Sequence, residues 1–317
     1  MQEERRQIAV LLEDISRQQG YKFKSFSDEW IFQITDKRGV DCYIWGYKFP
    51  NNASASCHIC DDKSALSSVL CEKKIPNVEH IYFENAKSSM VDDNGNWNKI
   101  IGLFEKYGIL VLKANSGSCG LNVYKCSTLK ELETAYYNIF QKNRAMAVCP
   151  YVEIKNEYRV IMLDGLPQII YLKERPYVVG DGVNDVKQLA ELKFGGEVVP
   201  IDGDIDTSVV LPKNKKLIIE WKHNLAHGSM PIILKEKTMK EKLEILAKRA
   251  AKALNLNFAS IDIVECEDGE LKILEANSGV MLEKFSKLSL ENYEIAKSIY
   301  CSALSAYFDK IDKNIIK

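Results

Sequence analysis

Residues 257–277 read NFASIDIVECEDGELKILEAN, and this stretch says most about the fold. An apolar run at 257–265 and a second one at 271–275 both read as β-strands. Between them, Glu267-Asp268-Gly269 has the composition of a tight turn. The stretch therefore predicts a β-hairpin near the C-terminal end of a mixed α/β chain.

Three polar side chains are expected at one end of this hairpin. Asp262 lies on the first strand, Glu275 ends the second, and Asn277 follows two residues later on the same strand face. Two carboxylates and an amide are the hard oxygen ligands that Mg²⁺ prefers. A polar strand edge is the alternative, but Glu275 follows the apolar Ile273-Leu274, and a buried carboxylate needs a partner.

Upstream, a lysine stands before a run of small residues. The apolar strand 109–113 ends in Lys113, and the run Asn115-Ser116-Gly117-Ser118-Cys119-Gly120 leads to a short strand at 122–125. Small residues allow backbone N–H groups to approach an anion closely, and the lysine adds a positive charge, which suits a polyphosphate. A glycine-serine hairpin without ligand is an equally good interpretation.

Two further segments lie between these features. Apolar residues 148–152 precede Glu157-Tyr158-Arg159-Val160, an arrangement that can supply a hinge for a nucleotide base and an acid for its ribose. Then Glu174-Arg175-Pro176 and Gly180-Asp181-Gly182 open a stretch, 176–235, that is rich in Gly, Asp, Asn and Pro. We expect this stretch to be irregular and to order on binding.

The remaining periodicity predicts helices and strands in alternation. We expect helices over 3–19, from an N-cap at Asp61-Asp62 to about 73, and over 96–107, 129–141, 239–255 and 290–308. Thr128 with Glu131, and Thr238 with Glu241, have capping-box spacing. We expect strands at 30–35 and 40–47, and three antiparallel strands at 145–152, 158–164 and 167–172 that are joined by tight turns such as Asp164-Gly165.

The order of these features resembles the ATP-grasp superfamily, and the resemblance runs from Asp61-Asp62-Lys63 to Asn277. Arg175-Pro176 with Gly180-Asp181-Gly182, and the later Asn224 to Gly228 element, resemble the branch that holds cyanophycin synthetases, bifunctional glutathione synthetases and ribosomal-S6-modification-type glutamate ligases. This implies two α+β lobes that sandwich ATP. It also implies a short α/β N-terminal domain at 1–60, a first lobe at 61–144 and a second lobe at 145–317.

The resemblance also implies roles for single residues. Lys63 and Lys113 resemble the two nucleotide lysines, residues 116–120 the loop over the phosphates, and Glu157 the ribose acid. A further set resembles the hinge that binds adenine in the family: Cys149, Pro150, Tyr151 and Val152. Asp262, Glu275 and Asn277 resemble ligands for Mg²⁺, with two ions expected and Mn²⁺ as an alternative. The expected catalytic residues are Arg159, Arg175, His223 and Asn224, and His223 is placed to hold the product phosphate.

The chain departs from the family pattern in three places. Many members have an arginine just before the asparagine that Asn224 resembles, where this chain has Trp221-Lys222-His223. Some have an arginine two residues before the first metal ligand, where this chain has Ser260. Members often have proline after the Glu-x-Asn segment, where this chain has Ser278-Gly279. These differences concern the cation that stabilises the acyl phosphate and the substrate that fits.

Composition excludes several classes of protein. Lys and Arg total 43 and Asp and Glu 44, a formal net charge of −1, whereas a generic nucleic-acid binder carries a basic excess. Hydrophobic residues make up 46% and charged residues 27%, as in an ordinary folded protein. No apolar run is long enough to span a bilayer, and the first twenty residues lack the pattern of a signal peptide. We therefore expect a soluble, cytoplasmic protein with reduced cysteines, no nucleic acid and no membrane partner.

Cys57-His58-Ile59-Cys60 has C-x-x-C spacing, but a structural zinc site needs a second ligand pair. We favour buried, reduced thiols over a metal or redox role for this pair. A lone histidine such as His80 is likewise more often structural.

The leading hypothesis is an ATP-dependent carboxylate–amine ligase that forms an amide through an acyl phosphate. Its partners would be small-molecule or peptide carboxylates and amines, and a homodimer is an option because dimers are common among the relatives. A kinase that phosphorylates a hydroxyl group and a non-catalytic nucleotide-binding protein remain the alternatives.

Overall fold

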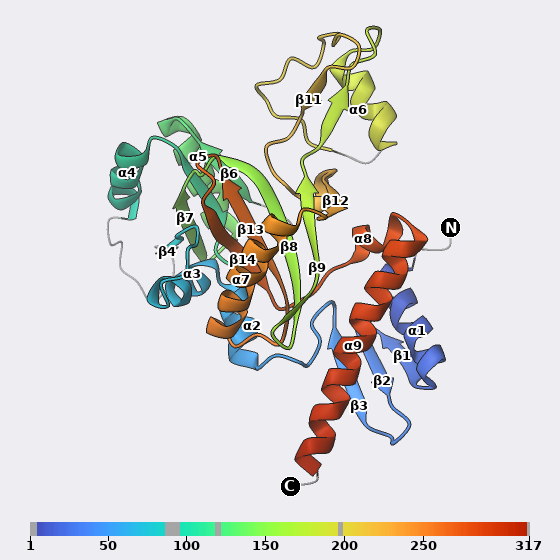
Figure 1. Ribbon diagram of the computed structural model, residues 1–317. Coiled ribbons are helices and arrows are strands. Elements are labelled where there is room, and N and C mark those ends of the chain that lie inside the picture. The colour runs from blue at the N-terminus through green and yellow to red at the C-terminus, as the bar shows by residue number, and fades with distance from the viewer. Residues whose placement is uncertain (1–4, 86–95, 118–121, 196–198, 316–317) are drawn as a thin grey trace.

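The computed structural model describes residues 5–85, 96–117, 122–195 and 199–315 (Figure 1). It contains a sheet of three strands, one of four, one of five and one of two. Every pair of neighbouring strands in these sheets is antiparallel. The predicted mixed α/β class is confirmed.

The N-terminal part combines α1 (Gln7–Gln19) with the sheet β1 (Lys22–Phe26), β2 (Ile31–Thr35) and β3 (Asp41–Trp45). Helix α1 ends where Gly20 takes φ 70°, a left-handed value that favours glycine. The sequence did not indicate β1, because most of its residues are exposed and it lacks apolar alternation. The C-terminal helices α8 (Glu283–Lys287) and α9 (Leu290–Ile315) pack against α1, so the two ends of the described chain share one core (Figure 1).

The five-stranded sheet has the order β12-β9-β8-β13-β14. It contains β8 (Ile154–Leu163), β9 (Leu166–Glu174), β12 (Met230–Ile233), β13 (Phe258–Cys266) and β14 (Leu271–Asn277). The predicted hairpin is therefore confirmed as β13–β14. One face of this sheet packs against α7 (Lys237–Ala253) and α3 (Lys63–Glu72), and α2 (Ser54–Asp61) contributes Cys60 to the same core.

The four-stranded sheet has the order β4-β7-β5-β6. It contains β4 (Ile81–Glu84), β5 (Leu110–Ala114), β6 (Val123–Cys126) and β7 (Ala145–Pro150), and α4 (Asn96–Tyr107) and α5 (Leu129–Lys142) share its core. The predicted capping box at Thr128 and Glu131 is confirmed. The predicted antiparallel trio is wrong in one respect: β7 pairs with β4 and β5, whereas only β8 and β9 form a hairpin. Apolar runs identify strands, but they do not identify the partner strand.

The stretch 176–235 is more ordered than predicted. It forms β10 (Tyr177–Val179), α6 (Val186–Phe194) and β11 (Lys216–Ile218), with a small apolar core of their own, before the 3-10 turn η1 (Leu225–His227) and β12. Asp185 and Gln188 cap α6 reciprocally, a signal that the turn-rich composition obscured. We call residues 177–219 the insertion, and Figure 1 shows α6 and β11 standing apart from the two large sheets.

Two smaller corrections concern helix ends. The N-cap of α7 is Glu236, whose carboxylate accepts from the N–H groups of Thr238 and Met239, so the predicted capping box at Thr238 is wrong. Asp62 caps α3 as predicted, with its side chain accepting from Ala65 N–H. Within the described residues, no helix is both long and apolar enough to cross a membrane.

The limits of the predicted units stay a prediction. Leu66 and Leu70 of α3 pack in the core of the five-stranded sheet, although they fall in the predicted first lobe. Ala296 and Leu304 of α9 pack with α1, although they fall in the predicted second lobe. Helix α3 therefore packs with the predicted second lobe, and helix α9 packs with the predicted N-terminal domain.

Candidate active site

A row of polar side chains crosses one face of the five-stranded sheet. Tyr171 lies opposite Arg159, Arg159 opposite Asp262, and Asp262 opposite Glu275. Because directly opposite residues of antiparallel strands project from the same face, these four side chains stand in one line across four strands. Apolar residues of the same face lie on both sides of the row: Ile161 and Phe258 join the core of the N-terminal part, and Val264 joins a cluster with the other sheet.

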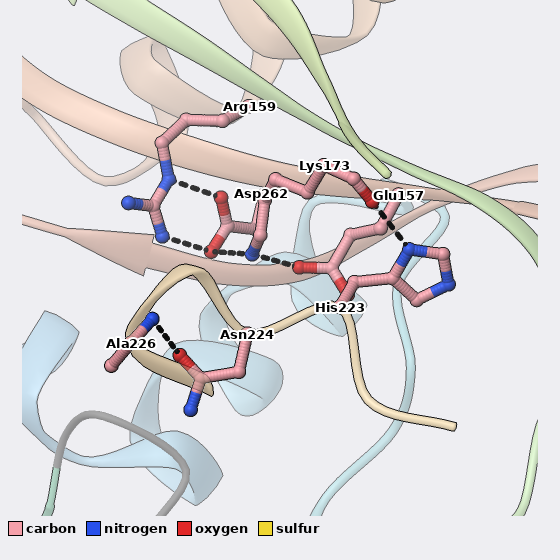
Figure 2. Close-up of polar contacts among 7 residues, drawn as sticks. All are labelled: Glu157, Arg159, Lys173, His223, Asn224, Ala226 and Asp262. Carbon is pink, nitrogen blue, oxygen red and sulfur yellow. Dashed lines mark hydrogen bonds and ion pairs between the residues drawn. The ribbon is translucent and has the colours of Figure 1, made fainter. Parts of the chain in front are cut away.

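The centre of the row is a buried ion cluster, drawn in Figure 2. Arg159 donates to Asp262 through Nε at 2.7 Å and Nη2 at 2.8 Å, and Lys173 Nζ lies 3.3 Å from the same carboxylate. Lys173 also pairs with Glu157. The cluster therefore places two cations against two carboxylates, so the group is neutral overall.

Burial and pairing have opposite effects on these acids. Burial alone would raise the pKa of Asp262, which is 2% exposed, but Arg159 and Lys173 hold this pKa well below its usual range. Burial raises the pKa of Glu157, and the charge of Lys173 only partly opposes it. Asp262 is thus the firmly ionised member of the cluster, with both of its oxygens in use.

Glu275 and Asn277, at the end of the row, differ from Asp262 because their side chains are unpaired among the described residues. Both are half-buried, and within the described residues neither side chain makes a hydrogen bond or an ion pair. Register places Asn277 opposite Ser260, two residues along the same face from Glu275. An open carboxylate and an open amide beside Asp262 fit a hard divalent cation, which prefers oxygen ligands. The predicted metal set therefore lies on one face of the β13–β14 hairpin, with two open donors and one donor that is already paired.

The two lysines that we expected to contact the nucleotide come from other elements. Lys63 begins α3 and donates through Nζ to Gly117 O at 2.9 Å, and its backbone N–H donates to Asn115 O. Lys113 lies on β5. Burial lowers the pKa of Lys63, and Glu275 is the nearby charge that most opposes this effect. Both lysines are buried.

The loop that follows Lys113 is only partly described. Ser116 forms an isolated bridge with Asp62, which fixes the start of the loop against α3. The other predicted loop residues, Ser118, Cys119 and Gly120, lie outside the described residues.

An apolar cluster joins the two large sheets and includes most of the predicted hinge. It contains Val111 and Cys149 from the four-stranded sheet, Val264 and Leu274 from the five-stranded sheet, and the hinge residues Tyr151 and Val152. Pro150 is the last residue of β7 and lies opposite Leu110. The lining is apolar and lies between two sheets, which is the setting in which a planar base can be buried.

Trp221 closes this cluster from the segment that follows the insertion. Its ring packs edge-on against Tyr151, with the ring centres 6.1 Å apart, and Lys125 lies over the Tyr151 ring at 4.0 Å. Trp221 thus connects the insertion to the hinge. Sequence reasoning noted it only as a departure from the family pattern.

The four residues that we expected to be catalytic differ in their surroundings. Arg159 is committed to Asp262, whereas half-buried Arg175 makes no hydrogen bond or ion pair with any other described residue. The Asn224 side-chain oxygen Oδ1 accepts from Ala226 N–H at 3.0 Å and caps the turn η1 (Figure 2). Of the two arginines, Arg175 is therefore the one that no other described side chain pairs with.

His223 is held in one tautomer. Its Nδ1–H donates to the carbonyl oxygen of Lys173 at 2.7 Å, and the buried Nε2 has no hydrogen-bond partner among the described residues. Burial lowers the pKa of His223 to about 4, so the ring is neutral at physiological pH. The free nitrogen of this neutral ring is a hydrogen-bond acceptor, and it cannot donate to a phosphate oxygen. The geometry therefore does not support the predicted role of His223 in holding the product phosphate.

Sequence reasoning missed Lys173, which contacts both buried carboxylates. The expected strand ended at residue 172, one position too early. A usable signal was present, because a lysine two residues after Tyr171 on a buried strand must find a counter-charge. The partners themselves could not be inferred, since Glu157 lies on β8 and Asp262 on β13.

The cysteine pair offers no metal site. Cys57 and Cys60 both lie on α2, and burial raises the pKa of Cys60 to about 12, which suits an unreactive thiol. His223 and His227 also have H-x-x-x-H spacing, but Nδ1 of each ring is already used, by Lys173 O and by the Asn224 side chain. Within the described residues, no three His, Cys, Asp or Glu side chains are grouped to hold a metal ion.

Comparisons with known proteins identify the fold. No family model matches the chain. It is 35% identical over 82 residues to the tetrahydromethanopterin:alpha-L-glutamate ligase of Methanocaldococcus jannaschii, which covers 25% of this chain and 27% of that protein. A bifunctional glutathione synthetase from Pasteurella multocida superposes with a TM-score of 0.56 over 92% of this chain, at 16% identity. The chain has an ATP-grasp fold.

A second solved ATP-grasp structure supports this assignment. The D-alanine–D-alanine ligase from Bacillus anthracis superposes with a TM-score of 0.54 over 82% of this chain and 72% of its own length, at 16% identity. By contrast, the chain spans only 43% of the glutathione synthetase. The predicted resemblance to the superfamily is thus confirmed at the level of the fold, with two sheets that face each other across the apolar cluster and the polar row.

Proposed function

We propose that this protein is an ATP-dependent, ADP-forming ligase that joins a carboxylate to an amine. The observation that carries the proposal is that buried Lys63, bonded to the loop after β5, feels the charge of Glu275, which with Asn277 forms an open pair of oxygen donors on the five-stranded sheet. Cations beside open oxygen donors are what polyphosphate with a divalent cation requires. The likeness to two amide-forming ligases and to part of a glutamate ligase supports this choice of reaction.

The apolar cluster between the sheets suits the adenine base. Tyr151 N–H is already used, because it donates to Ile109 O. Pro150 has no N–H group, and within the described residues Val152 N–H donates to no other backbone group. Val152 is thus the hinge residue that can donate to the base. Glu157 keeps one carboxylate oxygen for the ribose, while Lys173 holds the other.

Phosphates would lie between the lysines and the polar row. Lys63 and Lys113 neutralise charge on the β- and γ-phosphates, and the open donors Glu275 and Asn277 would hold Mg²⁺ beside Asp262, which stays paired with Arg159 and Lys173. Bound there, the cation would screen the charge that develops on the transferred phosphoryl group. Arg159 fixes Asp262 in place, and Arg175 binds the substrate carboxylate.

The reaction balances without a protein nucleophile. A substrate carboxylate oxygen bonds to the γ-phosphorus and ADP leaves, which gives an acyl phosphate. The amine nitrogen then attacks the acyl carbon, inorganic phosphate leaves with the bonding electron pair, and the nitrogen loses a proton to solvent or phosphate. The insertion and Trp221 would exclude water from the acyl phosphate, which otherwise hydrolyses.

An array of amino acids and dipeptides, scored for ADP release and for new amide products by mass spectrometry, tests the proposal. We expect ADP and an amide in equal amounts with at least one pair of substrates, and loss of both in Glu275→Ala. A phosphorylated hydroxyl product without amide would show a kinase instead. Absence of Mg-ATP binding would show that the site is not a nucleotide site.

A further inference from the structure

His80 contacts Lys113 inside the protein. Its Nε2 lies 3.2 Å from Lys113 Nζ, and His80 and Lys113 are 4% and 8% exposed. The ammonium group of lysine has three donors and no acceptor, so His80 Nε2 must accept the hydrogen bond. The proton of the imidazole therefore stays on Nδ1, and the ring is neutral.

The surroundings of His80 enforce this neutral form. Burial lowers the pKa of His80 well below its usual value, and the charges of Lys113 on β5 and Lys63 on α3 lower it further. Both lysine charges outweigh a backbone hydrogen bond with Val78 that acts the other way, and protonation would place a third positive charge in the same space. His80 thus remains an acceptor throughout the physiological pH range.

His80 also stands where the chain passes from one sheet to the other. Val78 N–H donates to Ile273 O on β14, and His80 N–H donates to Ser67 Oγ on α3, before β4 begins at Ile81 in the four-stranded sheet. The ring is therefore anchored on the side that carries Glu275 and Asn277, yet it holds a lysine of the opposite sheet.

We infer that His80 is a positioning residue that holds the Lys113 ammonium group for the nucleotide phosphates. The inference rests on the proposed function. A free lysine side chain has many rotamers, and part of this freedom must be lost when it binds a phosphate. A neutral acceptor on a fixed backbone removes that freedom before ATP arrives, and it offers no second charge that would compete with the phosphate.

Two matched substitutions test the role of the acceptor. The side-chain oxygen of His80→Gln can occupy the place of Nε2, whereas that of His80→Asn reaches only the place of Nδ1. Loss of a hydrogen bond to a charged group predicts about tenfold weaker Mg-ATP binding for the Asn variant, and binding within about twofold of the wild type for the Gln variant. Isothermal titration of the full chain with Mg-ATP measures both affinities. The KM for ATP should follow these affinities, while kcat changes less.

A double-mutant cycle with Lys113→Met separates positioning from general damage. If His80 acts through Lys113, His80→Asn has no further effect on Mg-ATP affinity in the Lys113→Met background. Equal loss in both backgrounds, or equal loss in the Gln and Asn variants, would overturn the inference. Normal affinity in His80→Asn would also overturn it and leave the proposed function intact, whereas normal affinity in Lys113→Met would count against the proposed nucleotide site itself.

Discussion

Asp262 and Glu275 lie directly opposite each other in one hairpin, yet they differ in every other respect. Asp262 is 2% exposed and both of its oxygens are bound by Arg159 and Lys173. Glu275 is half-buried and, within the described residues, has no hydrogen-bond or ion-pair partner. Two acids of one predicted metal set are thus a paired structural ion and an open donor.

Strand order explains the difference. β13 has β8 on one side and β14 on the other, whereas β14 is the edge strand of the sheet. An interior strand receives cations from its neighbours, so Asp262 meets Arg159 from β8 and Lys173 from β9. The edge strand has one strand neighbour only, which leaves Glu275 and Asn277 open to a ligand.

We expect the largest effect on stability when the ion pair between Arg159 and Asp262 is removed. Arg159→Leu leaves Asp262 buried without its bidentate partner, and we expect a loss of about 3 kcal/mol in the free energy of unfolding. Urea unfolding followed by circular dichroism measures this loss. A change below about 1 kcal/mol, the usual range for a surface substitution, would mean that the ion cluster is not structural.

Changing the open side should affect activity rather than stability. We expect Glu275→Gln to lower the rate of ADP formation by about 100-fold or more, because a charged ligand is lost for the cation that would screen the phosphoryl charge, while the urea midpoint stays unchanged. Glu270→Gln, on an exposed site at the other end of the same hairpin, is the matched control. Equal rates in the two variants would contradict the assignment of Glu275.

His223 extends the comparison to pH. Its pKa is lowered to about 4 in the folded state and is about 6.5 when unfolded, so the unfolded chain binds the proton more tightly. The contribution of neutral His223 to the free energy of unfolding is fully present above pH 6.5. It falls by on the order of 3 kcal/mol as the pH decreases toward 4. The difference in unfolding free energy between the wild type and His223→Asn, measured from pH 7 to pH 4, isolates this residue from His80. A difference that does not vary with pH would contradict the prediction.

The smallest effect concerns a paired acid that is exposed. Glu236 accepts from two backbone N–H groups at the start of α7. We expect Glu236→Ala to destabilise the protein by about 1 kcal/mol, as for other N-caps, and Thr238→Ala to have almost no effect. Thermal unfolding of both variants decides between the two caps. A larger loss in Thr238→Ala would restore the capping box that the sequence suggested.

Much of the fold could be predicted, because its signals are local. The periodicity of 96–107, the cap at Thr128 and the hairpin around Gly269 all depend on neighbours within a few residues. Errors arose where the deciding contact was distant. β7 was joined to the wrong strands, and α6 was overlooked because turn residues surround its capping box.

The candidate site shows the same difference between features set by local sequence and features set by distant contacts. The sequence by itself determined which residue types are present, and the order of Lys63, Lys113, Glu157, Asp262, Glu275 and Asn277 was enough to indicate an ATP-grasp fold. It could not determine which of these charges are already paired. Tertiary structure alone placed Lys173 between Glu157 and Asp262, and His80 against Lys113. Pairing depends on strand order and register between segments far apart in the chain, and no local pattern encodes either of them.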